Sequence, residues 1–201
     1  MRLMLYCVHL EQFPFPSPIR ASVEVVKELQ SCGKFDASSL SITGFSAGGA
    51  VALALSHKLG PARVKSVTAF FPMIEFEERY TADGAEIQHS EAIKSSMTDT
   101  MTECYIVAGT DRKDPDLTLR YADPDLFPHR LLLFCANGDT FYRSCLRFVE
   151  HVRTVRSHDE AQLVPIVGQA HNFDKLCGLD DERVRVREQA YEQAISAIRY
   201  A

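Results

Sequence analysis

Short apolar runs alternate along the chain with segments in which apolar residues recur every three or four positions. This alternation is typical of βαβ units, in which helices connect the parallel strands of one sheet. We therefore expect an α/β protein with a mostly parallel sheet flanked by helices. The predicted strands are residues 3–8, 40–43, 64–71, 131–136 and 162–167, and the predicted helices are residues 22–29, 46–59, 142–155 and 181–200.

Two segments do not follow this pattern. Residues 13–18 are rich in proline and are expected to be rigid and extended. Residues 73–120 contain many charged residues and little apolar periodicity, and only residues 85–97 within them fit a helix. We expect residues 73–120 to form an irregular cap or lid over a single domain that spans residues 1–201.

Composition and charge narrow the class of protein. The chain has 201 residues, 22 Lys and Arg, 27 Asp and Glu, and a formal net charge of −5. Its basic residues are scattered, which argues against nucleic acid as the main partner. Its longest apolar run is well below the roughly 18 residues that indicate a membrane span. These features predict a soluble domain.

The six cysteines do not follow the spacing of a disulfide framework or of a zinc site. A chain of this size can also bury a core without disulfide support. We therefore expect free thiols, a reducing cytoplasmic location, and no metal or other cofactor. The cysteines are Cys7, Cys32, Cys104, Cys135, Cys145 and Cys177.

The clearest chemical motif is Gly44-Phe45-Ser46-Ala47-Gly48, a G-x-S-x-G pentapeptide between a predicted strand and a predicted helix. Such a sharp turn exposes the serine and needs glycine where a Cβ would collide with neighbouring backbone. The first N–H groups of the helix point toward an anion that forms beside the serine. The motif predicts Ser46 as a nucleophile and the Ala47 N–H as an oxyanion donor, and a chance pentapeptide is the alternative.

A nucleophilic serine needs a histidine base and a carboxylate that orients it. Asp139 and His171 each follow a predicted strand, in the chain order Ser, Asp, His that this motif requires. Asp139 has an alternative role as a plain turn residue, because Asn-Gly-Asp favours turns. Weaker candidates lie on helices, in the irregular segment or in the wrong chain order. They are His9, His57, His89, His129, His151, His158, Asp114, Asp123 and Asp174.

Four segments resemble the α/β-hydrolase fold-3 family, the hormone-sensitive-lipase-like carboxylesterases. Residues 44–49 are similar to the family's G-[D/F]-S-A-G-G elbow, and residues 6–14 to its Y-R-L-A-P-E…F-P segment through Tyr6, Glu11 and Phe13-Pro14. Residues 114–128 resemble its D-P-x-L-S-P…A…L-P passage, and residues 138–140 with 170–174 resemble its G-x-D-x-L and H-G-F segments. The resemblance implies an α/β-hydrolase fold and a serine hydrolase that forms an acyl-enzyme through Ser46, Asp139 and His171.

The chain departs from this family at its N-terminus. The family has further strands and an H-G-G-G oxyanion loop ahead of the Tyr-Arg-Leu segment, and no H-G-G-G occurs in this sequence. The resemblance therefore implies a fold that lacks its first strands, including one that separates the strands at 3–8 and 40–43. We expect rearranged pairing of these two strands, a homo-oligomer or partner that covers the exposed edge, or an incomplete gene model.

Two functions fit these features. The first is a carboxylesterase or lipase-like hydrolase of a small-molecule ester or acyl substrate, with a related form that acts on thioesters or peptides. Its substrate pocket would use Phe45, Phe70, Phe71 and Met73, for which core packing is the alternative. The second is a catalytically impaired hydrolase with a binding role, because losing one oxyanion donor typically lowers turnover by about 10²–10³.

Overall fold

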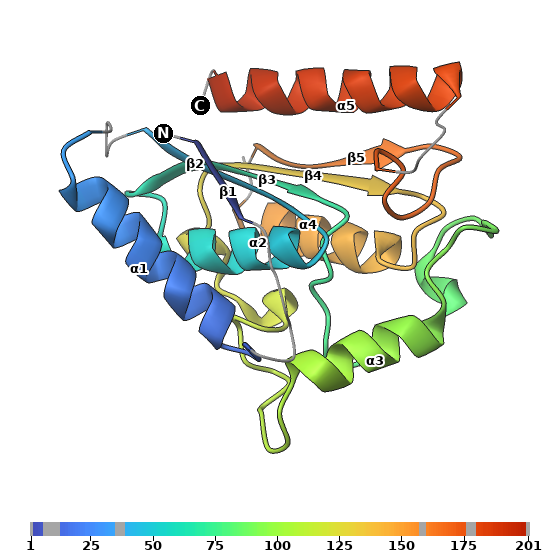
Figure 1. The fold of residues 1–201 in the computed structure, drawn as a ribbon, viewed down its shortest axis with the longest axis horizontal. Coiled ribbons are helices and arrows are strands. Elements are labelled where there is room, and N and C mark those ends of the chain that lie inside the picture. Colours follow the sequence, from blue (N-terminus) through green and yellow to red (C-terminus); the bar gives the residue numbers. More distant parts are fainter. Residues whose placement is uncertain (1, 6–12, 35–38, 157–159, 176–179, 200–201) are drawn as a thin grey trace.

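Five parallel strands form one sheet in the computed structural model (Figure 1). The structure describes residues 2–5, 13–34, 39–156, 160–175 and 180–199. Each strand pairs in parallel with the next one along the chain, which confirms the predicted α/β fold class. The strands are β1 (Arg2–Leu5), β2 (Leu40–Phe45), β3 (Val64–Phe70), β4 (Arg130–Ala136) and β5 (Glu160–Ile166).

The first strand pairs directly with the strand that leads into Ser46. The register runs from Arg2 opposite Ser41 to Leu5 opposite Gly44. This is the rearranged pairing expected when no strand lies between the two. Residues 6–8, which the sequence assigns to the same strand, lie outside the described residues.

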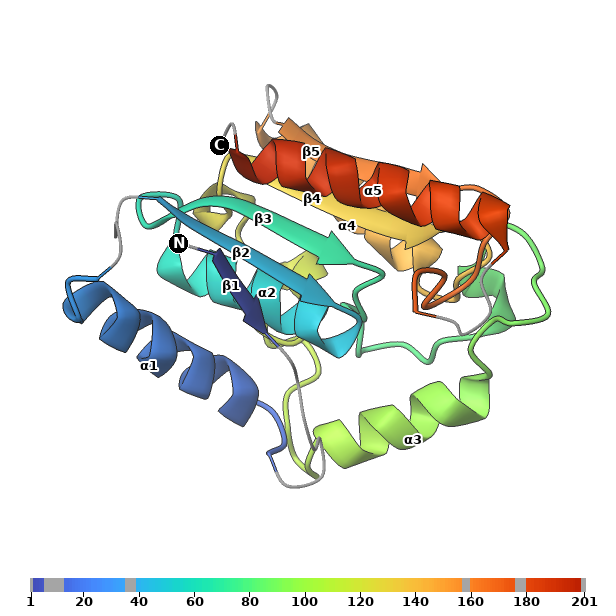
Figure 2. The ribbon, with the colours of Figure 1, turned by 45° about the horizontal axis from the view of Figure 1, so that its top comes forward.

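Helices cover both faces of the sheet. On one face, α2 (Ala47–Leu59) packs against β2 and β3, α4 (Tyr142–Arg156) packs against β4 and β5, and α1 (Ser17–Ser31) packs against α2. The opposite face carries α5 (Asp181–Arg199), which lies over β3 and β4 (Figures 1 and 2). When each strand connects to its next neighbour by a right-handed crossover, all the connecting helices lie on the same face of the sheet. Because α5 follows the last strand and connects it to no other strand, α5 can pack on the opposite face.

The first helix is longer than its apolar pattern predicts. It begins at Ser17 rather than at residue 22, and Phe15 and Pro16 form a turn just ahead of it. The expectation of a rigid extended segment at 13–18 was therefore wrong for residues 15–18. Proline is compatible with the first turn of a helix, where its missing N–H would have no intrahelical acceptor. Pro18 therefore lies inside the first turn of α1.

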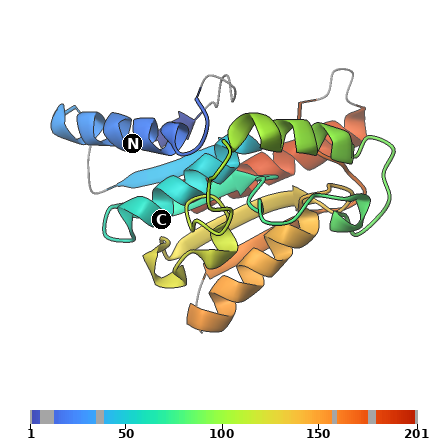
Figure 3. The same cartoon turned by 90° about the horizontal axis from the view of Figure 1, so that it is seen from below.

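The segment between β3 and β4 contains one α-helix and three short 3₁₀ helices. The helix α3 spans Ser95–Tyr105, so the predicted helix at 85–97 was wrong. The N–H groups of Glu86 and Ile87 donate to the carbonyl of Asn137 instead of to a helical turn of their own. The segment passes in front of α2 when the molecule is seen from below (Figure 3). The 3₁₀ helices are η1 (Ala82–Gly84), η2 (Leu119–Tyr121) and η3 (Pro124–Leu126).

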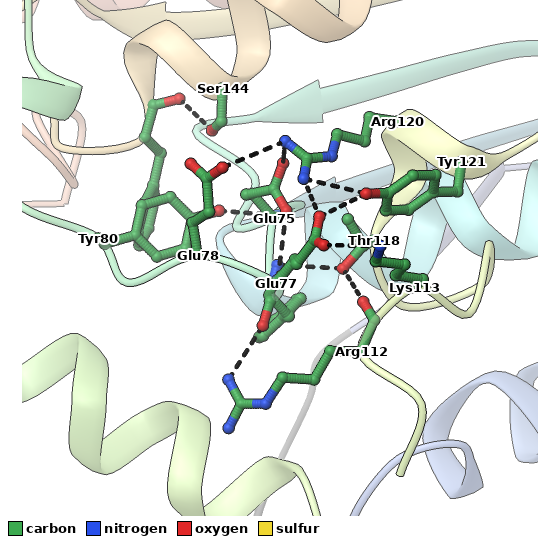
Figure 4. A network of polar contacts seen from close by, with 12 residues as sticks. Glu75, Glu77, Glu78, Tyr80, Arg112, Lys113, Thr118, Arg120, Tyr121 and Ser144 are labelled. Atoms are coloured by element: carbon green, nitrogen blue, oxygen red, sulfur yellow. Dashed lines mark hydrogen bonds and ion pairs between the residues drawn. The ribbon is translucent and has the colours of Figure 1, made fainter.

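A polar network joins the two ends of this segment (Figure 4). Arg120 forms ion pairs with Glu75, Glu77 and Glu78. Burial raises the pKa of the Glu75 carboxyl, and the charge of Arg120 opposes that rise. Residues 75–80 are thereby held against residues 112–121. The labelled members are Glu75, Glu77, Glu78, Tyr80, Arg112, Lys113, Thr118, Arg120, Tyr121 and Ser144.

The described residues can be compared with the expectations about membrane spans, metal sites and cysteines. None of the described helices is both long enough and apolar enough to cross a bilayer. No group of three or more His, Cys, Asp or Glu side chains within the described ranges is arranged to hold a metal ion. Cys7 and Cys177 lie outside those ranges. The described cysteines are Cys32, Cys104, Cys135 and Cys145, and no disulfide joins any two of them.

Candidate active site

A tight turn joins β2 to α2 and carries Ser46 at its apex. Ser46 has φ 51° and ψ −121°, a left-handed conformation that non-glycine residues rarely adopt. Its N–H donates to the carbonyl of Phe70 at 2.9 Å, which ties the strained residue to β3. A Cβ on Gly44 would lie 2.1 Å from the Gly48 carbonyl oxygen, so this position requires glycine. The turn has the geometry of a nucleophile elbow.

Three side chains predicted from the sequence meet at this turn. The Oγ of Ser46 lies 3.1 Å from Nε2 of His171, and Nδ1 of His171 lies 2.7 Å from Oδ2 of Asp139. The other carboxylate oxygen of Asp139 accepts the N–H of Phe141 at 3.0 Å. Serine, imidazole and carboxylate therefore form one continuous hydrogen-bonded chain at the carboxyl end of the sheet.

Aromatic rings hold the imidazole of His171 in place. The rings of Phe71 and Phe141 meet it edge to face, with centroids 4.7 Å and 5.1 Å away. His171 is 6% exposed and Asp139 is fully buried, so water has little access to the bond between them. The sequence did not indicate Phe141, because it is one of several apolar residues near the start of α4.

The start of α2 lies directly beside the serine hydroxyl. Ala47 is the first residue of this helix, and the first N–H groups of a helix have no intrahelical acceptor. The positive end of the helix dipole acts at the same place. This position is the one that an oxyanion donor requires, because negative charge on an attacked carbonyl would develop next to Ser46.

A small apolar cavity of about 20 Å³ begins at Ala47. Met73 is the predicted substrate-binding residue that lines it. The sequence did not indicate the other lining residues, because two of them, Met101 and Tyr105, belong to α3, which apolar periodicity did not reveal. The lining residues are Ala47, Ala50, Val51, Met73, Phe76, Met101 and Tyr105.

The other predicted substrate-binding residues lie elsewhere around the elbow. Phe70 stacks between Phe45 and Phe134, with both ring centroids 4.6 Å away, so its position favours the core-packing alternative. Phe45 is half-buried on the α5 side of the sheet, where its ring meets that of Tyr191 edge to face. Phe71 is buried against His171 and helps to position its imidazole.

The buried rival acid, Asp174, belongs to a separate polar cluster on the α5 side. Its Oδ2 accepts the hydroxyl of Tyr191 and lies 3.0 Å from the ammonium of Lys175. Lys175 also lies over the ring of Phe45, 3.9 Å from its centroid. Partial burial lowers the pKa of Lys175, but its bonds to Tyr191 and Asp174 outweigh that effect and raise it overall. The cluster links the loop after His171 to α5 and to the residue before Ser46.

Comparisons with known proteins agree with this geometry. A family model described as the alpha/beta hydrolase fold matches residues 12–175. A search of curated protein sequences finds no significant match.

Among solved structures, a thermophilic carboxylesterase cloned from a metagenomic library superposes with a TM-score of 0.79 at 17% identity. An esterase from the archaeon Pyrobaculum calidifontis gives 0.77 at 19% identity, and carboxyl esterase 2 from the fungus Tuber melanosporum gives 0.74 at 13%. In this order, the alignments cover 93%, 93% and 90% of this chain.

The same alignments cover 65%, 62% and 62% of those three proteins, so the chain spans less than two thirds of their length. The family match includes the elbow at Ser46, the turn that carries Asp139 (the acid turn) and the loop that carries His171 (the histidine loop). The solved structures share the arrangement of the sheet and its helices. The chain therefore belongs to the α/β-hydrolase fold family.

Proposed function

We propose that the protein is a serine hydrolase of small carboxylic esters that acts through an acyl-enzyme. The observation that carries the proposal is the unbroken chain of contacts from Ser46 Oγ to His171 and from His171 to Asp139. These contacts join residues far apart in the sequence, and they supply the nucleophile, the base and the orienting acid in the roles that acyl transfer needs.

Each residue has a defined part in the proposed reaction. Nε2 of His171 takes the proton of Ser46 as Oγ attacks the ester carbonyl, and the negative charge on the carbonyl oxygen faces the N–H of Ala47. The tetrahedral intermediate collapses to an acyl-serine, and the protonated imidazole returns its proton to the departing alkoxide. Water, activated by His171, then releases the acid and restores the serine. Asp139 stabilises the imidazolium in both halves.

Covalent labelling tests the proposed nucleophile directly. A fluorophosphonate probe reacts with an activated serine by forming a phosphorus–oxygen bond and releasing fluoride. We expect peptide mapping to locate the probe on Ser46 and no other serine, and we expect His171→Ala to slow the labelling. An unlabelled protein that is folded would contradict the esterase proposal and favour a binding role for an impaired hydrolase.

The apolar cavity beside Ala47 predicts a limit on the length of the acyl chain. Met101 of α3 forms part of its wall, so Met101→Ala should admit longer chains. We expect the ratio of kcat/KM for p-nitrophenyl hexanoate over acetate to rise by about tenfold, since a few buried methylene-sized groups contribute this much to discrimination.

Met97→Ala is the matched control, because Met97 lies on the same helix but is 58% exposed. It should leave the ratio unchanged. Equal chain-length profiles for wild type and Met101→Ala would mean that this cavity does not receive the acyl group.

A further inference from the structure

The side chain of Asn137 forms two long-range hydrogen bonds just ahead of the acid in the triad. It is 6% exposed and lies two residues before Asp139. Its Nδ2 donates to Glu86 Oε2 at 3.0 Å, and its Oδ1 accepts the N–H of Gly168 at 2.9 Å. Glu86 belongs to the segment between β3 and β4, and Gly168 lies near the start of the loop that carries His171. One amide therefore bridges two segments that are remote from it in sequence.

The chemistry of the two partners fixes the orientation of this amide. An N–H group can only donate and an ionised carboxylate can only accept, so Oδ1 must face Gly168 and Nδ2 must face Glu86. The backbone of Asn137 adds further bonds, because its N–H donates to Ile166 and its carbonyl accepts from Glu86 and Ile87. Donors and acceptors of both the side chain and the backbone are thus used to join separate segments.

The acid turn and the histidine loop are also in close contact beside Asn137. The N–H of Gly138 donates to the carbonyl of Gln169 at 3.0 Å. A Cβ on Gly138 would lie 2.6 Å from that same carbonyl oxygen and 2.8 Å from the Cβ of His89. A small displacement of any one segment would therefore move the others. The bond from Asp139 to His171 spans this junction.

A turn-forming role alone does not explain these contacts. Asparagine in a turn usually bonds to its own backbone two residues away, whereas Asn137 reaches residues 86 and 168. We propose that Asn137 is a positioning residue that holds Asp139 and His171 in register, with Glu86 as its anchor in the segment between β3 and β4. The expected effects on kcat and KM rest on the proposed function. The claim that Asn137 holds Asp139 and His171 in position does not depend on turnover.

A swap of donor and acceptor tests the bridge. Asn137→Asp removes the donor to Glu86 but keeps an acceptor for Gly168. Glu86→Gln alone keeps an acceptor for Asn137, so it should have little effect. The double variant Asn137→Asp/Glu86→Gln restores the bond in reverse, because the glutamine amide can donate to the new carboxylate. The double variant retains the added charge at residue 137 but removes the carboxylate at residue 86 that would repel it. Glu86→Ala, described below, therefore tests loss of the bond without placing two carboxylates side by side.

Two measurements report on the triad in these variants. The first is the low-field proton NMR resonance of His171 Nδ1–H, which reports on its bond to Asp139 and needs no turnover. The second is kcat and KM for p-nitrophenyl acetate. We expect Asn137→Asp to weaken the resonance and to lower kcat by about tenfold or more with little change in KM, since a misplaced base loses this much or more. The double variant should recover to within about threefold of wild type.

Control variants separate positioning from loss of stability. Glu91 lies in the same segment as Glu86 and forms an ion pair with Arg183 of α5. Glu91→Gln alters that ion pair and should match wild type in both measurements. Glu86→Ala removes the anchor from an exposed side chain, so it should fold normally and still lower kcat by about fivefold. It provides the test if Asn137→Asp does not fold.

Two results would overturn the inference. One is a double variant as impaired as Asn137→Asp alone, and the other is an unchanged resonance and kcat in both Asn137→Asp and Glu86→Ala. If the wild type shows the resonance but no Ser46-dependent turnover, the proposed function fails while the NMR series still decides the role of Asn137.

Discussion

Replacing Ser46 by alanine is expected to lower kcat for p-nitrophenyl acetate by about 10⁴- to 10⁶-fold, close to the uncatalysed rate. The hydroxyl of Ser46 is the group that lies 3.1 Å from His171 Nε2 at the elbow, and alanine leaves no atom there to attack an ester. The fold should remain intact, because the backbone N–H of residue 46 keeps its bond to Phe70. Steady-state hydrolysis and the melting temperature together measure both expectations.

Ser31→Ala is the control for the loss of a serine hydroxyl. Ser31 is exposed at the end of α1, and its Oγ donates to the Glu28 carbonyl. This variant should hydrolyse the ester at the wild-type rate. Equal rates for wild type and Ser46→Ala would show that any observed hydrolysis arises elsewhere on the surface.

Asp139→Asn is expected to lower kcat by about 10⁴-fold while leaving the fold nearly unchanged. The N–H of Phe141 donates to one oxygen of residue 139, so an asparagine must place its oxygen there and its NH₂ toward His171. That NH₂ can only donate, which forces His171 Nδ1 to accept and leaves the imidazole proton on Nε2. The base can then no longer take the proton of Ser46.

Asp174→Asn provides the comparison for a second buried carboxylate in the same region. Asp174 bonds to Tyr191 and Lys175 rather than to the imidazole, so its replacement should cost at most about tenfold in kcat. Measurement of kcat against pH for both variants separates the two roles. An equal loss in the two variants would mean that the contact with His171 is not what makes Asp139 important.

The apolar pattern predicted the sheet well because parallel strands that are buried on both faces appear in the sequence as continuous apolar runs. The position of Ser46 followed from glycine spacing at a strand-to-helix turn, and Asp139 and His171 followed from chain order and from their places after strands. All three meet in the structure. Their catalytic roles stay a prediction that labelling and the two substitutions above will test.

Other features depended on contacts that one sequence does not display. The start of α1 was misplaced because Pro16 and Pro18 indicate extended chain unless they lie in a first helical turn. The helix α3 has mixed polarity, with Thr98 buried and Met97 exposed, so its period was not recognisable. Asn137 resembled an ordinary turn residue because its partners at 86 and 168 lie far away in sequence.

The sequential order of the strands has a consequence for biogenesis. Since each strand pairs with the one synthesised just before it, the sheet can grow from β1 to β5 as the polypeptide leaves the ribosome. The serine turn is then complete after β3, while His171, which we propose activates its hydroxyl, follows β5 and is the last of the three residues to be synthesised. On that proposal, a nascent chain carries an inert hydroxyl until all five strands have been synthesised.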